Sequence, residues 1–292
     1  TMNLDITKSK QALNMLSKKL NSSILKTSNA IIKIANNNMV SALRSLLIEK
    51  GLDPRDFTLL CFGGAGPLHA GDLLSELNFK KAIIPNNPGQ FSALGFLVTD
   101  PRVDRQRTVQ LNSKNFKINE ANKTISDLLT ETKKELNEQG YRNNLKIKCS
   151  LEMRYSGQNY ELSVPIKQFV FTNNNIENIW NEFHKMHKIR FGFNIPGQII
   201  EIVTFNITGI YNKKKPKIAI SGKNKIKLNE ANRDIYFENK KFKSKIFNRS
   251  DMFPGFKCDG PIAVEEEASV TLIHPYHKLS VDNYNNLIIT KR

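Results

Sequence analysis

The sequence predicts a two-part fold, in which an α/β part is followed by an α+β part. Between residues 27 and 84 the order is helix, strand, glycine-rich turn, helix and strand, which is typical of α/β organisation with a parallel pair of strands. Residues 145–155 alternate apolar and polar side chains with a period of two, which predicts a strand with one buried face. Such alternation dominates after Asp100-Pro101, so we expect domains at residues 1–102 and 103–292.

The first part is expected to begin with a long helix from Thr27 or Ser28, either of which can cap it, to about Lys50. Its apolar residues recur at spacings of three and four, and Gly51 follows as a stop. Asp53-Pro54 then predicts a turn. Residues 58–62 are continuously apolar, which favours a short strand buried on both faces. A second helix is expected after residue 67, and a second buried strand at residues 82–84.

In the second part, the alternation of residues 145–155 resumes at residues 160–164, so we expect a hairpin or bulge near Ser156-Gly157. Residues 203–207 alternate as a further strand, and helices are expected at residues 119–139 and 176–190. Residues 213–232 are basic, polar and weakly patterned, which indicates a long connection.

The composition is that of an ordinary globular protein with a formal charge of +17. Nucleic-acid binding through this charge would give a steeply salt-dependent affinity, but the basic residues are scattered, which favours a solvated surface. No apolar run approaches the roughly 18 residues of a membrane-spanning helix, and no signal peptide is visible. The three cysteines form no C-x-x-C pair, so we expect no zinc site and a reducing, cytoplasmic compartment.

The most informative stretch is a glycine-rich turn between the first expected strand and the second helix. It contains Gly63, Gly64, Ala65 and Gly66, followed by Pro67 in the first helical turn. Glycines let the backbone approach a ligand closely, and the amides at a helix start favour an anionic group such as a phosphate. The stretch lacks the Lys-Ser/Thr of a P-loop and the G-x-G-x-x-G spacing of a dinucleotide fold. Nucleotide binding and a plain structural turn therefore remain equal alternatives from these residues alone.

Several further stretches make the chain resemble the C-terminal portion of the A subunit of the hydantoinase/5-oxoprolinase family, which includes N-methylhydantoinase A and acetone carboxylase β-like proteins. The matching stretches, in family order, are residues 34–44, 51–57, 62–70, 88–95, 153–158 and 183–193, Pro254-Gly255 and Gly260-Pro261.

This resemblance implies part of an actin/Hsp70-like ATPase lobe followed by a strand-rich C-terminal domain. It implies ATP and Mg²⁺ as cofactors, with Gly63, Gly64, Ala65, Gly66 and Pro67 forming the motif beside the adenosine and α-phosphate. His69 would lie in or near the cleft, and Asn38 is a further candidate for nucleotide contact.

The sequence departs from the family pattern at its start. The Asp-x-Gly-Gly-Thr-type turn that holds the β- and γ-phosphates and the metal is missing from these 292 residues. Family members carry several hundred residues before the point where Thr1 falls. We therefore expect a partial or split-gene chain that hydrolyses ATP poorly alone, with the metal site mainly in the N-terminal lobe.

Three other constellations each have a functional and a structural interpretation. Arg154, Tyr155, Gly157 and Gln158 form either a substrate or partner contact or a glycine-assisted bulge. His184 and His187 share a helix face, but no third metal ligand is evident, which favours packing. Residues 88–95 form either a loop that closes on the active site or a packed turn that leads into a helix or strand. We expect packing for His274 and His277 and a solvated edge for residues 265–267.

The function implied by the resemblance is ATP-driven opening of a small cyclic amide such as a hydantoin or 5-oxoproline. The A-type part would phosphorylate the ring carbonyl oxygen, and a B-type partner subunit would assist hydrolysis. The alternatives are an ATP-dependent ketone carboxylase subunit and a non-catalytic module that completes an ATPase on another chain. No catalytic nucleophile can be identified from residue spacing.

Overall fold

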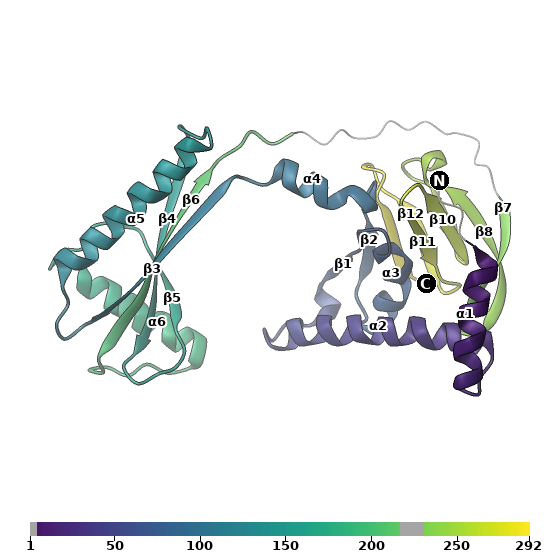
Figure 1. Ribbon diagram of the computed structural model, residues 1–292, viewed down its shortest axis with the longest axis horizontal. Helices are drawn as coiled ribbons and strands as arrows, with labels where there is room; N and C mark the ends of the chain where they lie inside the picture. Colours follow the sequence, from purple (N-terminus) through teal and green to yellow (C-terminus); the bar gives the residue numbers. More distant parts are fainter. Residues whose placement is uncertain (1–4, 217–230) are drawn as a thin grey trace. The chain divides into compact units, whose positions relative to one another are not determined.

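The computed structural model describes residues 5–216 and 231–292, which fall into two compact units. Unit 1 contains the described residues up to Leu97 and from Pro216 onward, and unit 2 contains Val98–Lys215 (Figure 1). The chain first passes from unit 1 to unit 2 between Leu97 and Val98, close to the expected boundary at residue 102. The compact units differ from the expected domains in one respect, because strands after residue 231 join the sheets of unit 1. Most of the expected connection at residues 213–232 lies outside the described residues, and Ala231 already begins a strand.

Unit 1 begins with two helices, α1 (Ile6–Lys19) and α2 (Ile24–Ile48). The Ser23 side chain caps α2 by accepting a hydrogen bond from the Lys26 amide. The predicted cap at Thr27 or Ser28 is therefore wrong, and Thr27 is instead buried within the helix. Gly51 follows the helix with a φ of +65°, as its expected role as a stop requires.

The main sheet of unit 1 contains five strands in the order β1-β2-β13-β12-β9. Their bounds are β1 Thr58–Leu60, β2 Lys81–Ile84, β9 Lys257–Asp259, β12 His277–Val281 and β13 Leu287–Lys291. β1 and β2 are parallel as predicted, with α3 (Gly66–Glu76) between them in sequence, and β2 pairs antiparallel with β13. The chain then forms the 3₁₀ turn η2 (Pro88–Gln90) and α4 (Phe91–Val98).

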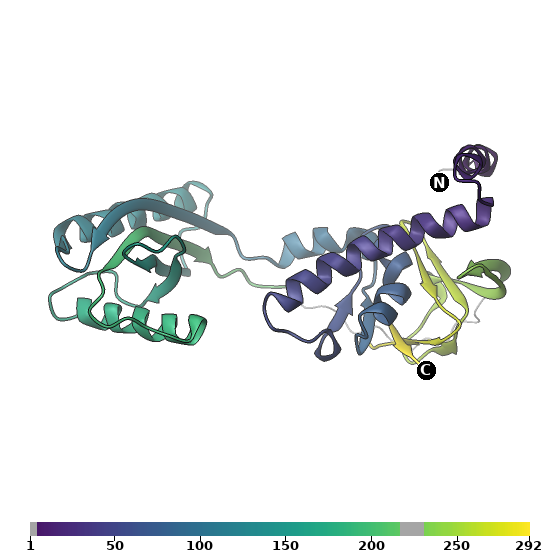
Figure 2. The same ribbon diagram turned by 90° about the horizontal axis from the view of Figure 1, so that it is seen from below.

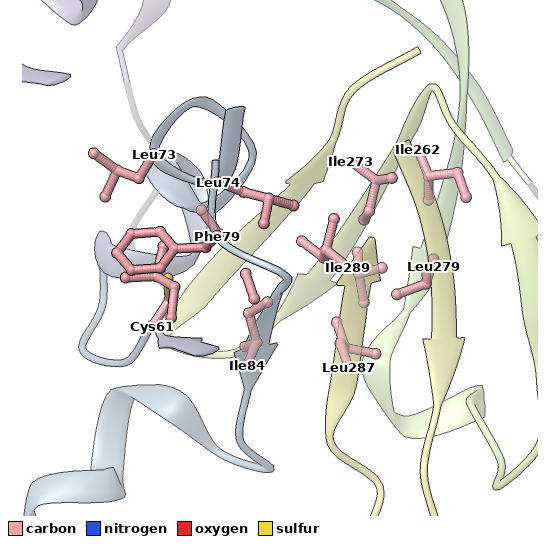
Figure 3. Packing of buried hydrophobic residues seen from close by; sticks show 14 of the residues in the cluster. Cys61, Leu73, Leu74, Phe79, Ile84, Ile262, Ile273, Leu279, Leu287 and Ile289 are labelled. Atoms are coloured by element: carbon pink, nitrogen blue, oxygen red, sulfur yellow. The ribbon is translucent and has the colours of Figure 1, made fainter. Parts of the chain in front are cut away.

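A second sheet of unit 1 has the order β11-β10-β8-β7. These strands are β7 Ala231–Phe237, β8 Lys240–Asn248, β10 Ile262–Glu266 and β11 Ser269–Ile273, and the 3₁₀ turn η3 (Arg249–Asp251) follows β8. Helix α3 packs against β11, and α2 packs against α3 (Figure 2). Side chains from α3 and both sheets meet in one apolar core (Figure 3). The strand that delivers the glycine-rich turn is therefore fixed to the C-terminal strands of the chain.

Strand β1 is buried on one face only, which corrects the prediction of two buried faces. Leu59 and Cys61 lie in the core, whereas Leu60 and Phe62 are 46% and 44% exposed. β1 is the edge strand of its sheet, and in the described residues only its inner face packs against the core.

Unit 2 is an antiparallel sheet of order β3-β6-β4-β5 with two helices. The elements are β3 Arg102–Asn112, α5 Ile118–Glu138, β4 Leu145–Tyr155, β5 Leu162–Ile166, α6 Ile176–Phe191 and β6 Ile200–Tyr211. The predictions for β4 and both helices are confirmed, the β4–β5 hairpin lies at the expected place, and the strand expected at residues 203–207 lies within β6. The alternate residues of β4 that face inward share one core with α5 and α6, so both helices cover the same face.

None of the helices in the described residues has the length and apolar character needed to cross a membrane.

Candidate functional site

The glycine-rich turn leaves the end of β1 in a conformation that only glycine adopts easily. Gly63 has a φ of +86°, and its amide donates a hydrogen bond of 2.8 Å to the Pro88 carbonyl. A Cβ added to Gly63 would meet no heavy atom within 4 Å. The turn therefore combines a left-handed backbone with open space beside it, which is the geometry a closely approaching ligand requires.

Two other segments, the 3₁₀ turn η2 and the loop that contains Ala268, pack against this turn. A Cβ on Gly64 would lie 3.2 Å from the Ala268 carbonyl oxygen, and one on Gly89 would lie 2.8 Å from the Ala268 Cβ. Ala268 lies in the turn between β10 and β11, so that hairpin, η2 and the glycine-rich turn meet at one point. Residues 88–98 form η2 and α4, which confirms a packed turn that leads into a helix. That this segment also closes on a ligand stays a prediction.

Helix α3 begins at Gly66 without a side-chain cap, because its N-cap residue is Ala65. Pro67 occupies the first turn and is buried, consistent with a position whose missing N–H removes no helical hydrogen bond. The uncapped amides and the helix dipole make this end of α3 suited to an anionic group.

A polar chain connects α3 to α2 one turn beyond the glycines. His69 Nδ1 lies 2.7 Å from Asn36 Oδ1, and Asn36 Nδ2 donates a hydrogen bond of 2.7 Å to Asp72 Oδ2. Asn36 is 6% exposed, and sequence reasoning missed it; the available signal was an asparagine on the buried face of an amphipathic helix. Asn38 is exposed and lies about 200° further around α2. Its expected nucleotide contact stays a prediction.

A polar cavity of about 990 Å³ adjoins the turn and shares Gly89 and Ala268 with its supporting segments. Its remaining lining residues are Asn86, Asn87, Gln90, Asn248, Arg249, Ser250, Met252, Glu265, Glu266, Glu267 and Asn285. Arg249 is 8% exposed and donates through Nη2 to the carbonyls of Asn285 and Pro85, at 2.5 and 3.4 Å. Burial lowers the pKa of Arg249 to about 10, although the charge of Glu266 acts to raise it. Burial also raises the pKa of the Glu266 carboxyl, although the charge of Arg249 acts to lower it. Sequence reasoning missed Arg249, because nothing in its local pattern indicates burial.

The open space at Gly63 and the uncapped amides at the start of α3 fit an anionic group such as a phosphate. Residues 5–216 and 231–292 contain no group of three or more His, Cys, Asp or Glu side chains arranged to hold a metal ion.

In unit 2, the expected contact residues bond to one another and to their neighbours. Tyr155 is 1% exposed, and its hydroxyl contacts His184 Nδ1 at 2.5 Å and accepts a hydrogen bond of 2.9 Å from the Ile195 amide. Arg154 Nε donates to Glu201 Oε2 at 2.9 Å, and this bond lowers the pKa of the Glu201 carboxyl.

The other two residues of this group form the turn after β4. Gln158 Oε1 accepts from the Tyr155 amide at 3.3 Å, and Gly157 turns the chain with a φ of +90°. These contacts favour the structural interpretation, and contact with a substrate or partner stays a prediction.

The histidines of α6 occupy packing positions. His187 is 1% exposed, and its Nδ1 lies 2.8 Å from the Phe193 carbonyl oxygen, among the rings of Tyr155, Phe183 and Phe191. Burial, with a smaller contribution from His187, holds the pKa of His184 below its usual value. The packing interpretation of this pair is therefore favoured.

The fold is similar to parts of two solved structures. The chain matches acetone carboxylase in its nucleotide-free structure with a TM-score of 0.78 and 19% identity, over 100% of this chain and 44% of the other. It matches an ATP-dependent caprolactamase from Pseudomonas jessenii with a TM-score of 0.72 and 25% identity, over 96% of this chain and 42% of the other.

The chain belongs to the hydantoinase/oxoprolinase family. The profile of that family matches residues 1–105, and the profile of the hydantoinase/oxoprolinase C-terminal domain matches residues 109–291. It is 33% identical to an uncharacterised protein of Methanocaldococcus jannaschii, over 96% of this chain and 40% of the relative.

Two relatives with named activities are more distant. Caprolactamase subunit alpha of Pseudomonas jessenii is 28% identical, over 86% of this chain and 38% of the relative, and 5-oxoprolinase 1 of Arabidopsis thaliana is 25% identical, over 88% and 20%. The chain thus spans two fifths or less of the length of these curated relatives.

Proposed function

We propose that this chain is part of the A-type subunit of an ATP-dependent cyclic-amide hydrolase and holds the adenosine side of ATP at residues 63–67. The observation that carries the proposal is the open, left-handed Gly63 directly before the uncapped start of α3. An anionic ligand gains from that helix end, and bulky residues would block its approach to the turn. The Mg²⁺ ion and the clamp on the outer phosphates belong, in this proposal, to a preceding lobe.

The reaction activates an otherwise unreactive ring amide. The carbonyl oxygen attacks the γ-phosphorus, and the bond from that phosphorus to ADP breaks. Water then adds to the activated carbon with the help of a B-type partner subunit, and the C–N bond opens as the nitrogen takes a proton, which leaves an acyl phosphate. A second water hydrolyses this acyl phosphate to the carboxylate and free phosphate. A carbonyl oxygen becomes a good leaving group only once it is phosphorylated, which explains the need for ATP.

An ATP-dependent ketone carboxylase subunit is the second candidate. The acetophenone carboxylase gamma subunit and acetone carboxylase beta subunit among its relatives favour it, but their identities are 23% and 21%, against 28% and 25% for the caprolactamase and 5-oxoprolinase relatives. A non-catalytic module that completes an ATPase is the third candidate, because the chain spans only part of each relative.

The test is phosphate release by the full-length protein with its B-type partner. It is measured with 5-oxoproline, hydantoin or caprolactam, with a ketone plus bicarbonate, and with ATP alone. Stimulation by a cyclic amide supports the proposal and identifies the substrate. Stimulation only by ketone plus bicarbonate supports the carboxylase, and no ATP hydrolysis under any condition contradicts both enzymatic functions.

A matched pair of variants tests the turn itself. Gly63 and Gly255 have φ angles of +86° and +87°, and a Cβ at either position meets no heavy atom within 4 Å. Gly63→Ala and Gly255→Ala should therefore lose similar stability, about 1–2 kcal/mol. Only Gly63→Ala should weaken ATP binding, measured by calorimetry. Equal ATP affinities in the two variants would contradict a nucleotide site at the turn.

A further inference from the structure

The hydrogen-bond network of His69, Asn36 and Asp72 allows only one arrangement of hydrogen atoms. An ionised carboxylate accepts hydrogen bonds and donates none, so Asn36 must present its Nδ2 group to Asp72, 2.7 Å away. The Asn36 oxygen then faces His69 Nδ1, also 2.7 Å away, and can only accept. His69 must therefore carry its proton on Nδ1, which leaves a lone pair on Nε2 in the neutral ring.

The positions of these residues on the helices make this constraint rigid. Asn36 is buried between α2 and α3, so its amide cannot exchange these partners for water. His69 and Asp72 are three residues apart on one face of α3, and helical side chains lean toward the N-terminal end. We infer from this tendency that the imidazole of His69 extends toward the glycine-rich turn, which ends at Gly66 in the same helical turn.

Asp72 also faces a second histidine, on the side away from Asn36. His274 Nε2 lies 3.6 Å from Asp72 Oδ1 and is too distant for a hydrogen bond. Burial keeps the pKa of His274 below its usual value, against the opposing charges of Asp72 and Glu238. The hydrogen-bond partner of Asp72 is therefore Asn36 and not His274.

We propose that Asp72, acting through Asn36, holds His69 in the Nδ1-protonated form, so that Nε2 accepts a hydrogen bond or proton from a group bound at the glycine-rich turn. This rests on the proposed function, which supplies the bound group: a hydroxyl of the nucleotide. Asn36 and Asp72 are positioning residues, and His69 is the group that meets the ligand.

The test is nitrogen NMR of the histidine side chains in the full-length protein. Five of the histidines lie in this chain. The His69→Gln variant assigns the His69 signals. We expect protonated Nδ1 and bare Nε2 in the native protein. Asp72→Ala frees the Asn36 amide to turn over, so both tautomers of His69 should appear. Native His69 protonated on Nε2, or an unchanged tautomer in Asp72→Ala, would overturn the proposal.

A swapped pair separates positioning from simple loss of packing. In Asn36→Asp/Asp72→Asn the carboxylate moves to position 36, where it accepts from both His69 Nδ1 and the new amide, so the native tautomer should return. Glu76→Ala, at an exposed position one turn further along α3, is the control and should leave the His69 signals unchanged.

Two further readouts distinguish this inference from the proposed function. ATP should shift the His69 Nε2 signal, and Asp72→Ala should weaken ATP binding on the order of tenfold, the loss of about one hydrogen bond to the nucleotide. The swapped pair should recover most of that loss. If the tautomers behave as expected but ATP leaves His69 unaffected, the network stands and the role at the turn is overturned. If ATP shifts His69 but cyclic amides do not stimulate phosphate release, only the proposed substrate class fails.

Discussion

Gly71 of α3 lies against the ring of His274, so closely that a Cβ on Gly71 would be 2.6 Å from His274 Cδ2. This close approach brings α3 against the segment that follows β11. It also explains a glycine in the middle of a helix, where glycine is otherwise unfavourable. The same approach places Asp72 beside His274.

Gly71→Ala should therefore destabilise unit 1 by about 1–3 kcal/mol, because the His274 ring must move or the helix must shift. Gly95→Ala is the control, since Gly95 is also helical but an added Cβ there meets no heavy atom within 4 Å. That substitution should be neutral or stabilise by up to about 1 kcal/mol. Urea denaturation measures both, and equal effects would show that the contact with His274 is not tight.

Stability should fall as the pH drops from about 6.5 towards 4, in part because of His277. Burial, and secondly the nearby charge of His274, lowers the pKa of His277 to about 4 in the folded protein. The unfolded chain binds a proton at its ordinary pKa, so acidification favours unfolding, by up to about 3 kcal/mol for this group.

His277→Gln removes this titration and keeps a polar partner for Ser75, whose hydroxyl lies 3.0 Å from His277 Nε2. Its unfolding free energy should depend less on pH than that of the native protein between pH 7 and 4.5. An identical pH dependence would show that other groups account for the loss.

Tyr155→Phe should destabilise unit 2 by about 1–3 kcal/mol. The substitution removes a hydroxyl that contacts His184 and accepts from the Ile195 amide, and both partners lose a partly buried hydrogen bond. Tyr160→Phe is the matched control, because the Tyr160 hydroxyl accepts from Gln158 at an exposed position. Thermal unfolding should separate the two variants clearly, and a loss as large in Tyr160→Phe would contradict this account.

The three cysteines should differ in their reaction with iodoacetamide at pH 8. Burial raises the pKa of the Cys61 and Cys149 thiols to about 12, so almost no reactive thiolate is present. Cys258 is partly exposed and should be alkylated first, as judged by peptide mass spectrometry. Modification of Cys61 or Cys149 in the native protein at the same rate would indicate that their cores open readily.

The sequence was sufficient for elements whose burial follows a strict period. Strand β4 matches its predicted bounds because every second residue faces one core, and α5 and α6 follow in the same way. Periodicity does not tell which sheet a strand joins, and the pairing of β2 with β13 therefore could not be predicted.

The sequence likewise predicts one part of the candidate site and not the rest. The glycine-rich turn was visible from residue types alone. Identifying Asn36 as the partner of His69 required the rotation of α2 about its axis, which depends on packing against α3. Likewise Arg249 is buried by segments that lie far apart in the sequence, and its own neighbours give no sign of this.

The position of β13 has a consequence for the order of events during synthesis. Residues 287–291 form the neighbour of β2, so the sheet that presents the glycine-rich turn lacks an internal strand until the ribosome has translated almost to Arg292. Residues 98–215, by contrast, contain all the strands of their own sheet and are translated earlier. A ribosome stalled before the codon for Leu287 would thus carry a chain in which unit 2 can fold while the candidate nucleotide site has not yet formed.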